Sequence, residues 1–242
     1  MSKTRKRYMF KLVGRILLFF IAIGLYFNNS NQFQILEENT FFHSFTFFHY
    51  LWLIWMIDII YQIIPLKNKF PIGSQKLFQS RYQAASQPIN KAGLRAYTRF
   101  ANKGATIVLC VWILFNLYIG AFYLKGIIDY QIMLLISIFF YVCDLICVLG
   151  WCPFRLMMKN RCCTTCRIFN WDHMMMFTPL IFVGGFFSVS LLIMSILACF
   201  VWEYCVYKYP ERFWDVSNIA LRCSTCTDKL CTQYCPHRKV TK

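Results

Sequence analysis

Charged residues are scarce in this chain, and acidic residues are the scarcest. Only 15% of the 242 residues are Asp, Glu, Lys or Arg, whereas soluble domains usually contain ~25%. The 10 acidic residues stand against 26 Lys and Arg residues, which gives a formal net charge of +16. The segments outside the apolar runs are too short to form a separate catalytic domain with its own core.

The patterns of several enzyme classes are also missing. The sequence has no Gly-rich phosphate loop, no H-E-x-x-H motif, no Ser/His/Asp arrangement and no carboxylate pair placed for hydrolysis. Hydrolase chemistry is therefore disfavoured. The basic residues flank apolar runs, where membrane topology and anionic lipid headgroups account for them, so nucleic acid is not expected as a partner.

Long apolar runs, in contrast, are abundant. A stretch of ~20 apolar residues matches the ~30 Å hydrocarbon thickness of a bilayer, and 58% of this chain is hydrophobic. We expect an all-α integral membrane protein, a multi-pass bundle of about five transmembrane helices in the lipid bilayer. The expected spans are 9–27, 45–64, 106–124, 127–149 and 177–206. Residues 1–206 would form this polytopic domain, and residues 207–242 a Cys-rich tail.

The distribution of basic residues predicts an orientation. Residues 1–15 and 65–105 carry many Lys and Arg residues and no acidic ones, which is typical of cytoplasmic segments. With five spans, the N-terminus would then lie in the cytoplasm and the tail outside the cell. The tail is itself basic, which favours the cytoplasm, and a hidden sixth membrane element, or a first segment that does not cross the membrane, would move it there.

Thirteen cysteines are the main clue to chemistry, and eight of them form two groups. The first group contains Cys152, Cys162, Cys163 and Cys166, and the second contains Cys223, Cys226, Cys231 and Cys235, followed by His237. Each group includes a Cys-x-x-Cys pair, a spacing that can hold one metal ion or form and break a disulfide. All nine residues are candidate metal ligands, and the four tail cysteines could complete a tetrahedral zinc site.

Two short stretches resemble iron–sulfur proteins. The tail ends in C-x3-C-P, which is similar to the ferredoxin run C-x2-C-x2-C-x3-C-P, although its middle gap is four residues. Gly150 to Pro153, with the sequence GWCP, resembles a fragment of membrane-bound ferredoxin-type maturation proteins. The resemblance implies electron transfer through an iron–sulfur cluster.

The leading hypothesis is thiol–disulfide exchange at or across the membrane with a redox partner protein. Cys163/Cys166 and Cys223/Cys226 would be the exchanging pairs, on opposite faces of the bilayer. The alternative is a non-enzymatic membrane protein whose cysteines bind structural zinc or an iron–sulfur centre. For the remaining cysteines, plain packing is the favoured interpretation; they are Cys110, Cys143, Cys147, Cys199 and Cys205.

Asp58 and Asp144 are the acidic residues set deepest within the expected spans. A carboxylate in hydrocarbon costs at least ~2.5 kcal/mol, so each should face a partner or a wet cavity. They could be structural, hydrogen-bonded between helices, or they could line a path in a small ion or metal transporter.

Overall fold

The computed structural model describes residues 2–37, 40–65, 73–160, 162–226, 228 and 230. Within these residues the fold is all-helical, and the only β-type pairing is an isolated bridge between Ala84 and Asn218. Cys231, Cys235 and His237 lie outside the described residues.

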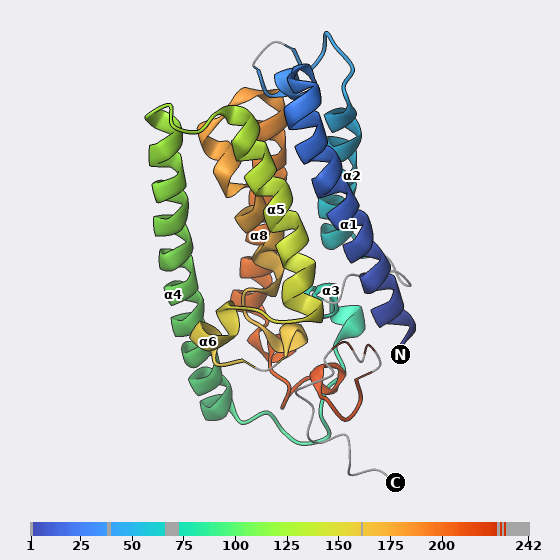
Figure 1. The fold of residues 1–242 in the computed structure, drawn as a ribbon. Coiled ribbons are helices and arrows are strands. Elements are labelled where there is room, and N and C mark those ends of the chain that lie inside the picture. Colours follow the sequence, from blue (N-terminus) through green and yellow to red (C-terminus); the bar gives the residue numbers. More distant parts are fainter. Residues whose placement is uncertain are drawn as a thin grey trace.

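Five helices run side by side to form the bundle (Figure 1). They are α1 Lys3–Asn28, α2 Phe47–Ile63, α4 Lys91–Leu124, α5 Tyr130–Leu149 and α8 Gly185–Lys208. Four of them are long and apolar enough to cross a membrane, and α2, with 17 residues, is shorter. The predicted helical bundle is therefore confirmed at the level of fold, with a helix count close to the expected one.

Polar residues next to the apolar runs begin several of these helices. The Ser2 hydroxyl caps α1 by accepting a hydrogen bond from the Arg5 N–H. Asn90 caps α4 in the same way, and the Asp129 carboxylate caps α5 by accepting from the Ile132 N–H at 2.8 Å. These side chains satisfy N–H groups that have no partner within the first helical turn.

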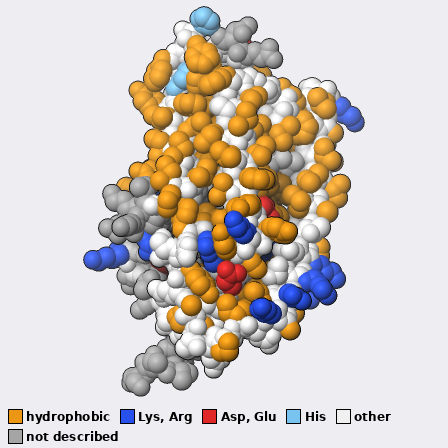
Figure 2. Space-filling model, turned by 180° about the vertical axis from the view of Figure 1, so that it is seen from behind, with side chains coloured by type: hydrophobic (Ala, Val, Ile, Leu, Met, Phe, Trp, Pro, Cys, Tyr) orange, Lys and Arg blue, Asp and Glu red, His pale blue; other side chains and the backbone are white. Residues whose placement is uncertain are grey.

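The core and the outer surface of the bundle are both apolar. Trp55, Phe177 and Phe187 are fully buried between helices, whereas Phe20, Leu114 and Phe200 point outward and are 62%, 66% and 65% exposed. Figure 2 shows hydrophobic side chains over much of one face, with most Lys and Arg side chains gathered toward the lower end. So much exposed apolar area is compatible with a membrane-embedded protein.

The expected span 177–206 is not one continuous helix, which corrects the sequence prediction. Residues Asp172–Phe177 form the short helix α7, Thr178–Phe182 form the 3₁₀ segment η5, and α8 begins only at Gly185. Pro179 lies at the start of η5, and Gly184 and Gly185 have φ values of +75° and +73°. Proline cannot donate a helical hydrogen bond, and positive φ is open mainly to glycine, so the helix is interrupted here.

This interruption places the tail at the same end of the bundle as the N-terminus (Figure 1). Residues Asp172–Phe182 lead the chain from the lower end toward the upper end, and α8 brings it back. The Ser2 hydroxyl donates a hydrogen bond to the Asp228 carbonyl at 2.6 Å. The start of α1 and the described part of the tail thus lie at one end of the bundle, because an additional ascending segment precedes α8. The predicted cytoplasmic and exterior sides stay predictions.

The described part of the tail packs closely on the bundle. Arg212 is 8% exposed and donates a hydrogen bond to the Leu77 carbonyl at 3.1 Å. Phe213 packs edge-to-face on Trp202 of α8, with their ring centroids 5.0 Å apart. Asn218 is fully buried and bonds the Arg212 carbonyl at 2.8 Å. These contacts hold the tail segment that leads to Cys223 and Cys226 next to the loops that connect the helices.

Replacing Gly185 by alanine should destabilise the fold. A Cβ at this position would lie 2.6 Å from the Leu36 carbonyl oxygen, on a backbone with φ +73°. We expect Gly185→Ala to lower the free energy of unfolding by about 1–3 kcal/mol, measured as a fall in melting temperature in detergent.

Gly24→Ala is the matched control, because a Cβ there meets nothing within 4 Å and alanine favours a helix. This variant should melt at or slightly above the wild-type temperature. Equal melting of both variants would contradict the proposed close contact at Gly185.

Candidate functional site

The cysteines of the first group lie where α5 ends and the chain turns back. Cys147 is in the last turn of α5, and Cys152 precedes the short helix α6 Phe154–Met158. Cys162 and Cys163 begin the 3₁₀ segment η3 Cys163–Thr165. Because α5 runs toward the lower end of the bundle, these cysteines lie at the end where α1 begins.

Cysteines from both groups meet at one pocket. Cys162 and Cys163 line it together with Cys226 of the tail, and Arg155 and Asp228 complete its polar lining. The pocket is small, about 20 Å³. The structure thus brings together two groups that are about 60 residues apart in the chain, whereas the sequence hypothesis placed them on opposite faces.

The sulfur atoms have specific neighbours. The Cys163 thiol donates to the Cys147 carbonyl, with a sulfur–oxygen distance of 3.6 Å, and Arg155 Nη2 lies 3.7 Å from the Cys163 sulfur. Cys162 Sγ lies 2.8 Å from the Thr164 hydroxyl oxygen. We call Cys147, Cys152, Cys162, Cys163, Cys166 and Cys226 the thiol cluster.

Cys152 ionises more readily than an ordinary thiol, because its pKa is lowered by its neighbours. A hydrogen bond from the Cys147 thiol, followed by backbone N–H groups of Phe154 and Arg155, lowers the pKa of Cys152 to about 7. Burial raises the pKa of Cys163 to about 12 and also raises the pKa of Cys166. Since the thiolate is the nucleophile in thiol chemistry, the geometry favours Cys152 as the attacking group.

The sequence analysis predicted Cys152 as a metal ligand and Cys147 as a packing residue. Their spacing was a usable signal, because two residues five apart can approach each other when a helix ends between them. The chain turns at Gly150, whose N–H bonds the Ile146 carbonyl as the C-cap of α5.

The structure shows neither a disulfide nor a formed metal site within the described residues. No disulfide joins two of the described cysteines, and among them Cys223 is exposed and Cys226 partly buried. Across the same residues, no three His, Cys, Asp or Glu side chains are grouped so that they could hold a metal ion. The described ligand candidates therefore do not by themselves fit zinc or an iron–sulfur cluster.

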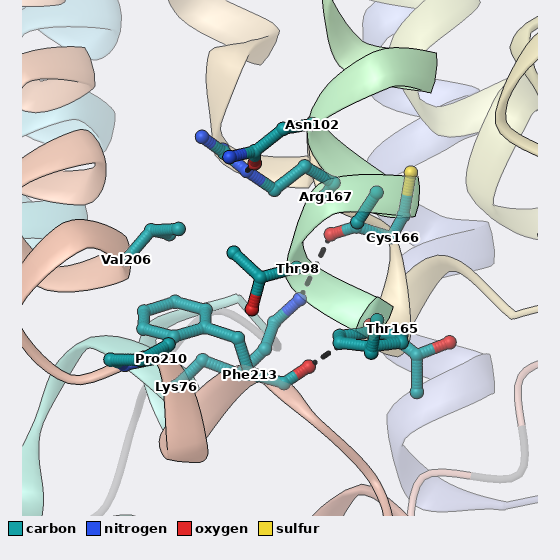
Figure 3. Close-up of a pocket in the computed structure, with 11 residues that line it drawn as sticks. Lys76, Thr98, Asn102, Thr165, Cys166, Arg167, Val206, Pro210 and Phe213 are labelled. Atoms are coloured by element: carbon teal, nitrogen blue, oxygen red, sulfur yellow. Dashed lines mark hydrogen bonds between the residues drawn. The ribbon is translucent and has the colours of Figure 1, made fainter. Parts of the chain in front are cut away.

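Next to Cys166 lies a buried lysine that the sequence analysis did not single out. Lys76, in the short helix α3 Ser74–Leu77, is 1% exposed. Its amine donates to the Cys166 carbonyl at 3.0 Å and lies 4.8 Å from the Trp202 ring centroid. Figure 3 shows this side chain reaching toward Cys166. Burial lowers the pKa of Lys76 to about 8.

Asp58 and Asp144 come together in a second polar site, deeper in the bundle. Both line a cavity that also includes Arg15 of α1, and Arg15 Nη1 lies 2.8 Å from Asp144 Oδ2. The expectation that each carboxylate faces a partner or a cavity is therefore confirmed in the fold. Their role in transport stays a prediction.

Comparison with known proteins adds no assignment: no family model, curated protein or solved structure matches this chain. Its function must be inferred from the arrangement of its own residues.

The stability of the fold should depend on pH through Lys76. Because its pKa is about 8 in the fold and 10.5 ordinarily, the unfolded chain binds more protons between these values. Stability should therefore rise with pH across this window, by up to about 3 kcal/mol from this group. The measurement is chemical unfolding of wild type and Lys76→Met in detergent from pH 7 to 10.5.

We expect the wild type to gain stability relative to Lys76→Met as the pH increases. Lys91→Met, which changes an exposed lysine at the start of α4, controls for the loss of a lysine as such. A constant difference between wild type and Lys76→Met over the whole range would show that Lys76 is not buried as a charged group.

Proposed function

We propose that this protein is a membrane-embedded thiol–disulfide oxidoreductase that acts on one face of the bilayer. The observation that carries the proposal is the meeting of Cys162, Cys163 and Cys226 at one pocket, next to the Cys147–Cys152 pair. Thiol exchange needs sulfur atoms that approach one another, and the shared pocket of these three cysteines at one end of the bundle supports such chemistry.

The apolar surface supports the membrane location. Four helices have the length and composition of membrane spans, and large side chains along α1, α4 and α8 face outward. The basic segments 3–15 and 76–103 lie at the end that carries the thiol cluster. By the positive-inside rule, this end faces the cytoplasm.

The proposed reaction transfers two electrons from the protein to the disulfide of a partner protein. The Cys152 thiolate attacks one sulfur of that disulfide, whose S–S bond breaks, and a mixed disulfide forms while the other partner sulfur leaves as a thiolate. Cys147, after losing its proton, attacks the Cys152 sulfur and releases the second partner thiolate. The two thiolates take up the two protons, and a Cys147–Cys152 disulfide remains.

Other cysteines of the thiol cluster are placed to receive this disulfide in turn. The Cys163 thiol contacts the Cys147 carbonyl, and Cys226 lies across the pocket from it. A dithiol of a second partner protein would reverse the steps and restore the reduced protein. Because the cysteines of the thiol cluster lie at one end of the bundle, this scheme passes electrons between partners on one face and does not relay them across the membrane.

Cys147→Ala should slow the reaction of Cys152 with an alkylating reagent at neutral pH. Without the Cys147 hydrogen bond, the Cys152 thiolate loses its main stabilising contact, and its titration midpoint should rise by one pH unit or more. We expect about tenfold slower alkylation by iodoacetamide at pH 6, measured by mass spectrometry of the Cys152 peptide.

Cys110→Ala is the matched control, because Cys110 is exposed on α4 and lies outside the thiol cluster. Its removal should leave the alkylation rate of Cys152 unchanged. Oxidation of the wild type by diamide should yield a Cys147–Cys152 disulfide. If purified protein instead contains stoichiometric zinc that protects these thiols from alkylation, the oxidoreductase proposal fails in favour of a structural metal site.

A further inference from the structure

A polar cavity of about 60 Å³ lies within the apolar bundle, between the thiol cluster and the buried aromatic core. Four helices supply the ionisable side chains that line its inner part: α1, α2, α5 and α7. These residues are Arg15, Asp58, Asp144, Asp172 and His173. Ionisable groups at such positions are costly and usually functional.

One part of the lining is a paired network. Arg15 Nη1 contacts Asp144 Oδ2 at 2.8 Å and donates to the Tyr141 carbonyl at 2.6 Å. The Arg15 guanidinium also lies over the Tyr141 ring, 3.6 Å from its centroid. The Tyr141 hydroxyl donates to Asp58 Oδ2 at 3.2 Å. The charges of Arg15 and Asp144 thus offset each other. The donor that Asp58 receives from this network is the neutral Tyr141 hydroxyl.

The other part of the lining contains an unsatisfied group. Asp172 accepts hydrogen bonds from Gln62 Nε2 at 2.9 and 3.1 Å, and its Oδ1 lies 3.2 Å from His173 Nδ1. His173 is 6% exposed, and its Nε2 has no hydrogen-bond partner among the described residues. A buried polar atom without a partner is expensive, which indicates that something binds there.

The charges around His173 favour a cation. Three carboxylates, Asp58, Asp144 and Asp172, face Arg15 and, at the exposed rim, Lys11. The cavity therefore carries one net negative charge when His173 is neutral, and none when it is protonated. No charged side chain of the fully described helix α8, which packs on α7, lines the cavity.

The cavity is closed toward the upper end of the bundle. One helical turn above Asp58, Asp144 and His173 lie Trp55, Tyr141 and Phe177. The Trp55 ring centroid is 4.9 Å from that of Phe177 and 5.7 Å from that of Tyr141. Tyr8 and Lys11, by contrast, line the cavity toward the N-terminal end. A ligand that reaches His173 would therefore enter from the N-terminal end of the bundle.

We propose that this cavity is a proton-binding site, in which the Asp172–His173 pair takes up one exchangeable proton from the N-terminal end of the bundle. A proton neutralises the excess negative charge and turns the orphan Nε2 into a donor. Water supplies its partner, since the cavity exceeds the ~10–15 Å³ needed to hold a water molecule. This site is independent of the thiol chemistry proposed above.

The test is a pH titration of His173 by NMR, using protein in nanodiscs with ¹⁵N-labelled histidine rings. The chain has four histidines, and His173→Gln identifies the signal. We expect His173 to titrate between pH 4 and 9. Asp172→Asn should shift the midpoint down by one pH unit or more, since the neighbouring carboxylate stabilises the protonated ring. Asp58→Asn should shift it in the same direction by less.

Asp129→Asn is the matched control, because Asp129 caps α5 at the opposite end and asparagine also caps helices. It should leave the midpoint unchanged. If Asp172→Asn does not fold, the wild-type and Asp58→Asn titrations decide the question. The proposal is overturned if His173 does not titrate in this range, if the Asp58 and Asp172 variants leave its midpoint in place, or if its signal depends on Na⁺ or Zn²⁺ at fixed pH.

Discussion

The interruption between Asp172 and Gly185 determines where both candidate sites lie. A continuous helix over residues 177–206 would carry the tail to the end opposite the N-terminus. Instead, α7 and η5 ascend through the bundle before α8 descends, so the tail returns to the N-terminal end, where the thiol cluster is. The same ascending segment places Asp172 and His173 beside Arg15 and Asp144. One break in helical structure thus brings Cys226 of the tail to the thiol cluster. It also brings Asp172 and His173 to the polar cavity.

Much of the fold could be predicted from apolar periodicity and length alone, because helices in an apolar setting must satisfy their backbone groups internally. Spans 9–27, 106–124 and 127–149 fall within or close to α1, α4 and α5. The run 45–64 became α2, which has 17 residues and is shorter than the four candidate spans. The run 177–206 departs most, because its apolar composition concealed the break. Pro179 and the Gly184–Gly185 pair were the available signals, because such residues often end regular structure.

The candidate sites were less predictable than the fold. Spacing identified the clustered cysteines, but the contact between Cys147 and Cys152 and the burial of Lys76 depend on how α3, α5 and α6 pack. Cys147 and Lys76 belong to no local sequence motif. The depth of Asp58 and Asp144 in apolar runs did indicate that each carboxylate faces a partner or a wet cavity. Their actual neighbours, Arg15 and the Asp172–His173 pair, come from helices distant in the chain, which a single sequence does not reveal.

The thiol pocket and the polar cavity are adjacent and share part of their lining. Val148 lines both the thiol pocket and the polar cavity, and α5 supplies Asp144 to one site and Cys147 to the other. Thiol–disulfide exchange would require protons to leave and reach sulfur atoms, and the core above the cavity is apolar. Under both proposals, protons would therefore exchange through the N-terminal end, where basic side chains also gather. The side chains of Trp55, Tyr141 and Phe177 lie between this end and the rest of the bundle, so the proposed chemistry would stay one-sided unless they rearrange.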